Sequence, residues 1–180
     1  GSPASLADSN QVLSRSLSDG SGGAFLVWED YRSGDADIYA QHLDGAGNRL
    51  WGANGTLVVS QTLGQESPVL ASDGSGGIIV AWQDSRTGAY DIYAQALSAA
   101  GATRWPSGGI PLCTATGNQV LQVATSDASG GAIVAWRDLR GVDSDIYVQR
   151  VNNAGTTLWT LNGSAVCDTL GTQNDVRILS

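Results

Sequence analysis

The 180-residue sequence contains no lysine and no methionine, and it has one histidine, one phenylalanine, two cysteines and four prolines. Its nine basic residues are all arginines and face seventeen acidic ones, which gives a net charge of -8 at pH 7. Such a chain repels the phosphates of nucleic acids and of anionic membranes, so neither is an expected partner. A lysine-free acidic surface is also typical of proteins that stay soluble outside the cell.

Metal ligands and long apolar runs are scarce as well. Two cysteines and one histidine are too few for a zinc site of the usual kind, so we expect no metal and no cofactor. No apolar run approaches the length of about 18 residues that a membrane span needs, and no signal peptide is present. Residues 1–10 fit no repeated unit and are interpreted as a lead-in or a vector-derived remnant.

One stretch of the chain occurs three times. In the middle copy it reads SDGSGGIIVAWQDSRTGAYDIYAQ over residues 72–95, and the other copies cover residues 18–41 and 126–149. The copies start at positions 18, 72 and 126, so each start lies 54 residues after the previous one, and the alignment needs no gap. A period this strict indicates stacked copies of one structural unit.

Each unit is predicted to hold four short antiparallel strands. In the middle unit, residues 78–82 form an apolar run rich in β-branched side chains, which is typical of a strand buried on both faces. The polar residues 84–88 then turn the chain into residues 91–97, which alternate between polar and apolar. Residues 67–71 and 110–113 supply the first and last strands. A repeated four-stranded meander is typical of a β-propeller blade, so the fold class is all-β.

The pattern P-x-x-x-S-D-G, an apolar strand and D-x-R-x-G-x-x-D-I-Y resembles the TolB-like β-propeller repeat. It is also similar to repeats of large secreted bacterial proteins of unassigned function, which implies a secreted or periplasmic location. In TolB-like propellers the first strand of a unit is the inner one. This implies blades at 11–63, 64–117 and 118–171, followed by a surplus inner strand at 172–180.

Three blades are too few for a closed ring, since propellers use about four to eight. An open arc would expose two apolar blade faces, which soluble monomers avoid. Head-to-tail association buries both faces, so the expected partner is the chain itself. Two chains give six blades and three give nine; the TolB resemblance favours the homodimer over the homotrimer. Residues 11–18 and 172–180 both fit the inner position of the blade at each junction. Either the C-terminal segment completes a blade of the neighbouring chain by strand exchange, or the N-terminal strand completes it and displaces that segment.

Each unit carries an Asp-x-Arg pair in the turn after its second strand, and a further aspartate before Ile-Tyr. These residues are Asp30, Arg32 and Asp37; Asp84, Arg86 and Asp91; and Asp138, Arg140 and Asp145. Paired carboxylates are typical of acid–base catalysis or calcium binding. Because the setting is the same in every copy, whereas catalysis needs neighbouring groups tuned apart, we interpret them as structural turn clusters. A single-turn cation site at the D-x-D spacings remains the alternative.

Two sets of tryptophans recur in register. Trp28, Trp82 and Trp136 close an apolar strand and are expected to pack between blades. Trp51, Trp105 and Trp159 lie in a segment flanked by glycine and polar residues, where an indole either packs between blades or binds a sugar or protein partner. The two cysteines, Cys113 and Cys167, are also one period apart, too far to bond across adjacent blades, and are expected to be buried free thiols.

From these patterns we expect a non-catalytic β-propeller module for binding or scaffolding, not an enzyme. The alternatives are a multivalent lectin that uses the outer tryptophans to bind glycans, and a carbohydrate-active enzyme with acidic residues at the central channel. A catalytic centre should break the 54-residue register. The clear breaks are charge swaps, such as Glu29, Gln83 and Arg137 at one repeat position.

Overall fold

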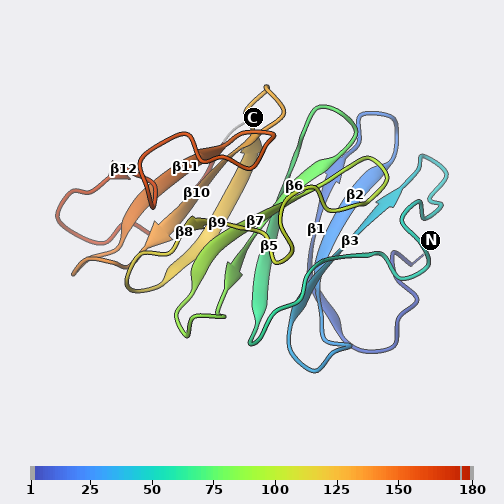
Figure 1. Cartoon of the computed structure of the whole chain (residues 1–180), viewed down its shortest axis with the longest axis horizontal. Coiled ribbons are helices and arrows are strands. Elements are labelled where there is room, and N and C mark those ends of the chain that lie inside the picture. The colour runs from blue at the N-terminus through green and yellow to red at the C-terminus, as the bar shows by residue number, and fades with distance from the viewer. Residues whose placement is uncertain (1–2, 175, 179–180) are drawn as a thin grey trace.

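The computed structural model describes residues 3–174 and 176–178, which form twelve strands in three four-stranded sheets and no helix (Figure 1). Each sheet is an antiparallel meander of four consecutive strands. Blade 1 holds β1 (Gln11–Ser18), β2 (Ala24–Asp30), β3 (Asp37–Leu43) and β4 (Thr56–Val59). Blade 2 holds β5 (Gln65–Ser72), β6 (Ile78–Asp84), β7 (Asp91–Leu97) and β8 (Ile110–Cys113). Blade 3 holds β9 (Gln119–Ser126), β10 (Ala132–Asp138), β11 (Asp145–Val151) and β12 (Ser164–Cys167). The prediction of an all-β fold with three propeller-type blades is confirmed.

The three blades stand side by side in chain order, and β5 lies between the inner strands β1 and β9 (Figure 1). Alternate residues of β6 face opposite neighbours, as expected for a strand buried on both sides. Ile78 and Val80 belong to a core with blade 1, whereas Ile79 and Ala81 belong to a core with blade 3. The apolar run of each unit thus builds the core between blades, not a core within one blade.

Each inner strand carries a β-bulge at the same repeat position. Leu13, Ser67 and Leu121 have φ angles of 51°, 54° and 55°, and the pairing with the second strand shifts register there. A bulge leaves backbone groups unpaired in the ladder and re-aims nearby side chains. These three bulges lie on the side of the blades that faces the centre of the arc.

Residues 3–10 of the lead-in lie against blade 1. Gln11 Nε2 donates hydrogen bonds to the carbonyls of Ala7 and Ser9. The side chain of Gln119 makes the same bonds in the connection before blade 3. Residues 7–10 therefore repeat a connection between blades, a likeness that lies in backbone shape and escapes the sequence alignment.

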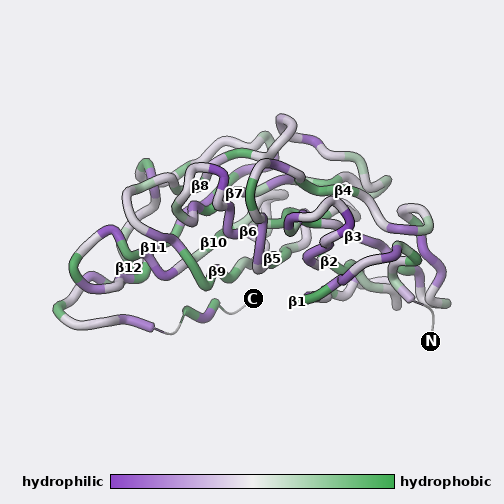
Figure 2. Tube along the Cα trace, turned by 90° about the horizontal axis from the view of Figure 1, so that it is seen from below, coloured by the Kyte–Doolittle hydropathy of each residue, from purple (hydrophilic) through white to green (hydrophobic). Residues whose placement is uncertain are grey.

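The segment 172–178 forms no strand in its described residues. Gln173 N donates to the carbonyl of Ser144 at 2.9 Å, the same bond that opens β5 and β9. The segment then turns beneath the inner strands (Figure 2), where Ile178 lies beside Val69 and other residues of β5 and β9. Residues 172–174 and 176–178 of the predicted surplus strand therefore form no strand within this chain, and positions 175, 179 and 180 lie outside the described residues. Its exchange with a neighbouring chain stays a prediction.

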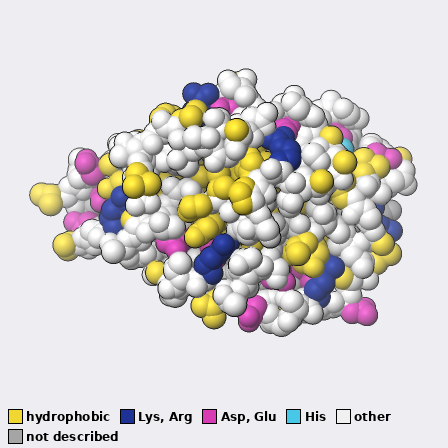
Figure 3. All heavy atoms as spheres, viewed as in Figure 1, with side chains coloured by type: hydrophobic (Ala, Val, Ile, Leu, Met, Phe, Trp, Pro, Cys, Tyr) yellow, Lys and Arg dark blue, Asp and Glu magenta, His cyan; other side chains and the backbone are white. Residues whose placement is uncertain are grey.

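The described residues contain no helix long and apolar enough to cross a membrane. On the face seen in Figure 3, arginine and acidic side chains lie scattered among uncharged ones and form no continuous patch of one sign.

Both cysteines are free thiols, as predicted, although only Cys113 is buried and Cys167 is half-buried. Cys167 differs because no further blade covers it.

Candidate functional site

The Asp-x-Arg turns have the same geometry in all three blades. In blade 2, Asp84 Oδ1 accepts hydrogen bonds from Arg86 N at 3.0 Å and from Arg86 Nε at 2.7 Å. Asp84 Oδ2 accepts from Arg86 Nη2 and from Trp82 Nε1. The guanidinium also lies 4.1 Å from the ring centroid of Tyr93, a cation–π distance. Both carboxylate oxygens are thus bonded inside the turn, and the buried carboxylate faces no solvent.

Hydrogen bonds keep Asp30 and Asp138 charged. Burial opposes the charge on Asp30 and Asp138, but hydrogen bonds from the adjacent arginine and tryptophan outweigh it and hold the pKa of both carboxyls below its usual value. The second aspartate bonds a hydroxyl of its own turn in blades 1 and 2. Asp37 and Asp91 bond the hydroxyl four positions earlier, at 2.5 and 2.7 Å, instead of the arginine. No group of three or more His, Cys, Asp or Glu side chains in the described residues is arranged to hold a metal ion.

The outer tryptophans pack between blades wherever a following blade exists. Trp51 and Trp105 are 6% and 7% exposed, and each Nε1 donates to a carbonyl of the next blade at 3.0 Å, that of Ala99 and that of Asn153. Trp159 follows the last blade and is 40% exposed. A sugar cannot stack on Trp51 or Trp105 unless the blades separate. The multivalent lectin interpretation, which needs three equivalent rings, therefore does not fit this geometry.

Four residues that do not recur in the repeat meet at the junction of blades 1 and 2. They are Glu29, Tyr31, Glu66 and Tyr90, which we call the acidic cluster. Their equivalents in the other two blades are Gln83 and Arg137, Ser85 and Leu139, Val12 and Val120, and Ala36 and Ser144, respectively. The repeat therefore does not explain why these four side chains are present.

The bulge of β5 holds Glu29 in place. Side chains two residues apart on a strand share a face, so Glu29 points toward blade 2 with Val27. Glu29 Oε1 accepts a hydrogen bond at 2.7 Å from Ser67 N, a group that the bulge removes from the strand ladder. Glu29 Oε2 accepts from the Tyr31 hydroxyl at 3.1 Å. This buried carboxylate is fixed at both oxygens.

Glu66 precedes Ser67 on β5 and is only half-buried. Its Oε2 accepts from the Tyr90 hydroxyl at 3.0 Å, while its Oε1 has no hydrogen-bond partner among residues 3–174 and 176–178. Burial, together with the two glutamates, raises the pKa of Tyr31 and of Tyr90, so both hydroxyls stay protonated and act as donors at neutral pH. The cluster thus combines one fixed carboxylate with one that keeps a free oxygen.

A groove of about 260 Å³ adjoins the cluster along the inner strands of the three blades, and Asn174 and Val176 of the C-terminal segment also line it. Ser67 belongs to both sites, because its N–H bonds Glu29 and its carbonyl accepts from Gln122 Nε2. Gln122 is buried, and its Oε1 has no partner among the described residues. Leaving a buried acceptor unpaired costs about 1–3 kcal/mol. Gln83, the repeat equivalent of Glu29, lines the same groove.

Sequence reasoning identified Glu29 and Gln83 as breaks in the repeat but missed Tyr31, Glu66 and Tyr90. The signal that identified Glu29 would also have identified these three residues, since none of them recurs after 54 positions. They lie at three different places in the unit, however, and Glu66 and Tyr90 come from a different blade than Tyr31. Only the packing of blade 1 against blade 2 brings them together.

No protein-family model matches the sequence, and no curated protein matches it. Solved structures share the fold. The crystal structure of an N-acetylgalactosamine deacetylase from F. plautii, in complex with blood group B trisaccharide, aligns over 87% of this chain and 54% of its own, with a TM-score of 0.55 and 8% identity. A proposed glycoside hydrolase from Parabacteroides distasonis aligns over 88% and 53%, with a TM-score of 0.53 and 12% identity. A proposed glycosidase from Bacteroides thetaiotaomicron aligns over 85% and 53%, with a TM-score of 0.52 and 7% identity.

At these identities the likeness establishes the fold alone, and this chain spans about half the length of each of these proteins. It nevertheless contradicts the expectation that the chain is not an enzyme, because the proteins that share its fold include a deacetylase and two proposed glycosidases. That expectation rested on the recurring aspartates, and among the residues that do not recur it considered only charge swaps such as Glu29. The likeness to TolB-like repeats stays a prediction.

Proposed function

We propose that this chain forms part of a carbohydrate-active propeller in which Glu29 and Glu66 are a hydrolytic carboxylate pair. The observation that carries the proposal is the meeting of two non-recurring glutamates from different blades beside a groove with an unpaired amide oxygen. Glycoside hydrolysis uses two carboxyl groups, one to protonate the leaving oxygen and one to act on water or on the sugar. The fold that the chain shares with carbohydrate-active proteins agrees with this chemistry.

The two glutamates suit different roles. Glu66 keeps a free oxygen and is partly exposed, so it fits the acid that gives its proton to the glycosidic oxygen as the bond to the anomeric carbon breaks. Glu29 is fixed by Ser67 and Tyr31, and each of its oxygens has a second lone pair, so it fits the base that takes a proton from the attacking water. The donors on Glu29 hold its orientation while the proton moves.

The groove supplies a place for the sugar beside this pair. Its amides, Gln83 and Gln122, each carry donors and an acceptor, which matches the two-way hydrogen bonding of sugar hydroxyls. Because Ser67 contacts both Glu29 and Gln122, a sugar held at the groove lies next to the carboxylates. We therefore expect Gln122 to affect binding and the glutamates to affect turnover.

Hydrolysis of a panel of nitrophenyl glycosides and oligosaccharides tests the proposal. Glu29→Gln and Glu66→Gln should each lower kcat by about 100-fold or more, as expected for loss of a catalytic acid or base. Asp35→Asn, which changes an exposed carboxylate in a turn, is the matched control and should leave kcat unchanged. Gln122→Leu should raise KM more than it lowers kcat.

Three results would overturn the proposal. The parent chain turns over no member of the panel; both glutamate variants keep the parent's kcat; or the parent binds a sugar without cleaving it. Thermal melting of each variant shows that a loss of activity does not come from unfolding.

A further inference from the structure

The contact that joins successive blades recurs inside the chain. Trp51 packs on a turn of blade 2, where a Cβ added to Gly101 would lie 2.7 Å from the indole Cγ. Trp105 packs on the matching turn of blade 3, where a Cβ added to Gly155 would lie 3.1 Å from the ring. Each indole also donates its N–H to a carbonyl of the turn that it covers. The chain therefore makes the same tryptophan–glycine contact twice.

Blade 3 presents the tryptophan half of this contact without its partner. Trp159 is 40% exposed, whereas its two equivalents are 6% and 7% exposed. On the adjacent strand β12, Val166 is 65% exposed, whereas its equivalents Val58 and Leu112 are 3% and 2% exposed. Hydrophobic side chains are visible at this end of the molecule, on the left of Figure 3. This face has the composition of the faces that a following blade covers.

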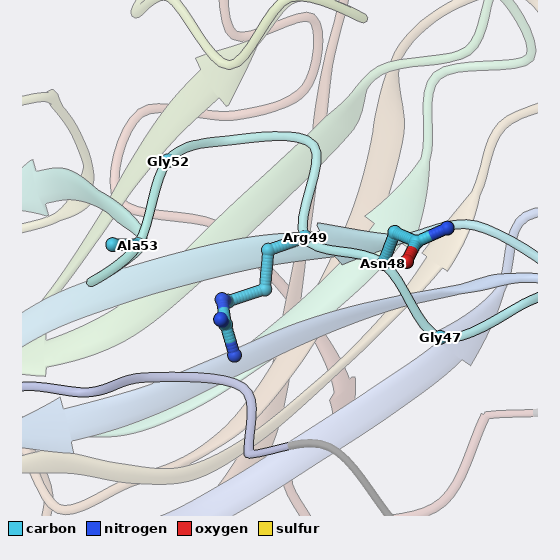
Figure 4. A pocket seen from close by; sticks show the side chains of 5 residues that line it. All are labelled: Gly47, Asn48, Arg49, Gly52 and Ala53. Carbon is cyan, nitrogen blue, oxygen red and sulfur yellow. The ribbon is translucent and has the colours of Figure 1, made fainter.

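Blade 1 presents the other half, an empty cavity. Gly47 aligns with Gly101 and Gly155 and has a φ of 81°, close to their 79° and 82°. A Cβ added to Gly47 would meet no atom within 4 Å. The cavity, of about 340 Å³, is called the socket here and is lined by Gly47, Asn48, Arg49, Gly52 and Ala53 (Figure 4).

We propose that two copies of this chain associate head to tail, with Trp159 of one copy in the socket of the other. The occupant is a second copy because this chain carries both halves of a contact that it already makes twice. The indole would pack on Gly47 and donate its N–H to the carbonyl of Gly45, the equivalent of Ala99 and Asn153. Such an interface is heterologous, because it joins two different surfaces of the chain. A closed pair forms the contact twice, once from each Trp159, and contains six blades. This proposal is independent of the proposed function.

The same alignment gives Cys167 a partner. Cys113 lies against blade 3, with its Sγ 3.3 Å from Arg140 Nη2 and 3.8 Å from Asp138 Oδ2. Cys167 holds the matching position in blade 3 and is half-buried. In the assembled pair it would face the Asp-x-Arg turn of blade 1 of the other copy. Association should therefore bury the Cys167 thiol.

Residues 3–6 lie along the socket and compete with the second copy. Arg49 Nη1 donates to the carbonyl of Pro3 at 2.7 Å, and the Arg49 side chain extends toward this segment in Figure 4. Leu6 N donates to the carbonyl of Ala53 at 3.2 Å. Two socket residues are thus bonded to the segment. Deletion of the chain through Leu6 frees both, so it should tighten the association.

Sedimentation velocity over a range of protein concentrations tests the proposal. The parent should show a reversible dimer, and Trp159→Ala and Gly47→Ala should each raise the dissociation constant about 30-fold or more, as for loss of a hot-spot tryptophan. Gly74→Ala is the matched control, since Gly74 also has a positive φ, 70°, and open space at its Cβ. The Gly74→Ala dimer should have the same dissociation constant as the parent dimer. The deletion through Leu6 should lower the dissociation constant.

Mixing the two variants distinguishes this contact from any other. In an equimolar mixture, the Gly47→Ala copy supplies an intact tryptophan and the Trp159→Ala copy supplies an intact socket. The mixture should therefore associate more tightly than either variant alone. An interface that involves neither residue would show no such rescue.

Alkylation of Cys167 gives a second readout. Its rate should fall as the parent concentration rises and should stay constant in Trp159→Ala. Thermal melts of the variants check that each one folds. The proposal is overturned if the parent stays monomeric at its highest soluble concentration. It is equally overturned if neither substitution weakens the association or if mixing restores nothing.

Discussion

Trp105 donates its indole N–H to the carbonyl oxygen of Asn153, 3.0 Å away across the boundary between blades 2 and 3. The bond fixes the tilt of one blade against the next, because the ring also packs flat on the glycine turn that follows Asn153. Repeat proteins gain their stability from such contacts between neighbouring units. The outer tryptophans of this chain are therefore part of its interblade core.

Trp105→Ala should destabilise the fold far more than Trp159→Ala. Removing a buried tryptophan leaves a cavity and costs about 3–5 kcal/mol, whereas Trp159 is already 40% exposed in a single chain. Urea unfolding measured at low protein concentration, where the chain is monomeric, compares the two variants. Equal losses of stability would contradict the packing role of Trp105.

Arg86→Ala should lower the free energy of unfolding by about 1–3 kcal/mol, because it leaves the carboxylate of Asp84 buried with too few donors. Arg86 is the only cation that bonds this carboxylate in the described residues. Arg15→Ala is the control, since Arg15 is exposed and, among the described residues, bonds only a carbonyl of its own strand. A variant at Arg86 that is as stable as the parent would remove the structural role assigned to the turn.

The repeat made most of the fold predictable. A spacing of 54 residues, with an apolar run such as Ile78–Trp82 in each copy, was sufficient to place the strands of each blade and to identify the buried faces. The backbone shape of the connection before Gln11 and the path of the chain after Gln173 were not predictable. Neither depends on a side-chain pattern, since one is set by hydrogen bonds to carbonyls and the other by packing across the inner strands.

The acidic cluster was harder to predict for a different reason. A site made of residues that do not recur is difficult to recognise in a repeat sequence. Glu29 alone was interpreted as an isolated charge swap, because its neighbours in space were not known. Glu66 and Tyr90 belong to another blade, so their approach depends on how blades 1 and 2 pack. Recurring residues report the architecture of such a chain, and the residues that fail to recur are the ones to search for function.

The two cysteines should differ sharply in reactivity. Burial raises the pKa of the Cys113 thiol to about 11, and the Cys167 thiol is half-buried. Because the thiolate is the reactive form, iodoacetamide at about pH 8 should label Cys167 first and Cys113 only on unfolding. Peptide mass measurement gives the two rates, at a protein concentration low enough to keep the chain monomeric. Faster labelling of Cys113 would contradict its burial between blades 2 and 3.

Acid should destabilise the fold in part through Asp30 and Asp138. Burial opposes their charge, but hydrogen bonds from arginine and tryptophan prevail, so the pKa of each carboxyl is below 3.8 in the folded chain. The unfolded chain, with the ordinary pKa, then binds more protons at low pH than the folded chain. The stabilisation is therefore complete above the unfolded pKa and is lost as the pH falls through the folded pKa.

Urea midpoints between about pH 6 and about pH 2 measure this loss. Asp138→Asn removes one carboxyl with a lowered pKa, so its midpoint should fall less steeply below pH 3.8 than that of the parent, even though the variant is less stable at neutral pH. The slope is the informative quantity, because the substitution also removes an ion pair with Arg140. Asp35→Asn, in an exposed turn, should keep the parent's slope. Identical slopes for Asp138→Asn and the parent would show that this carboxyl has the same pKa in the folded and unfolded chains.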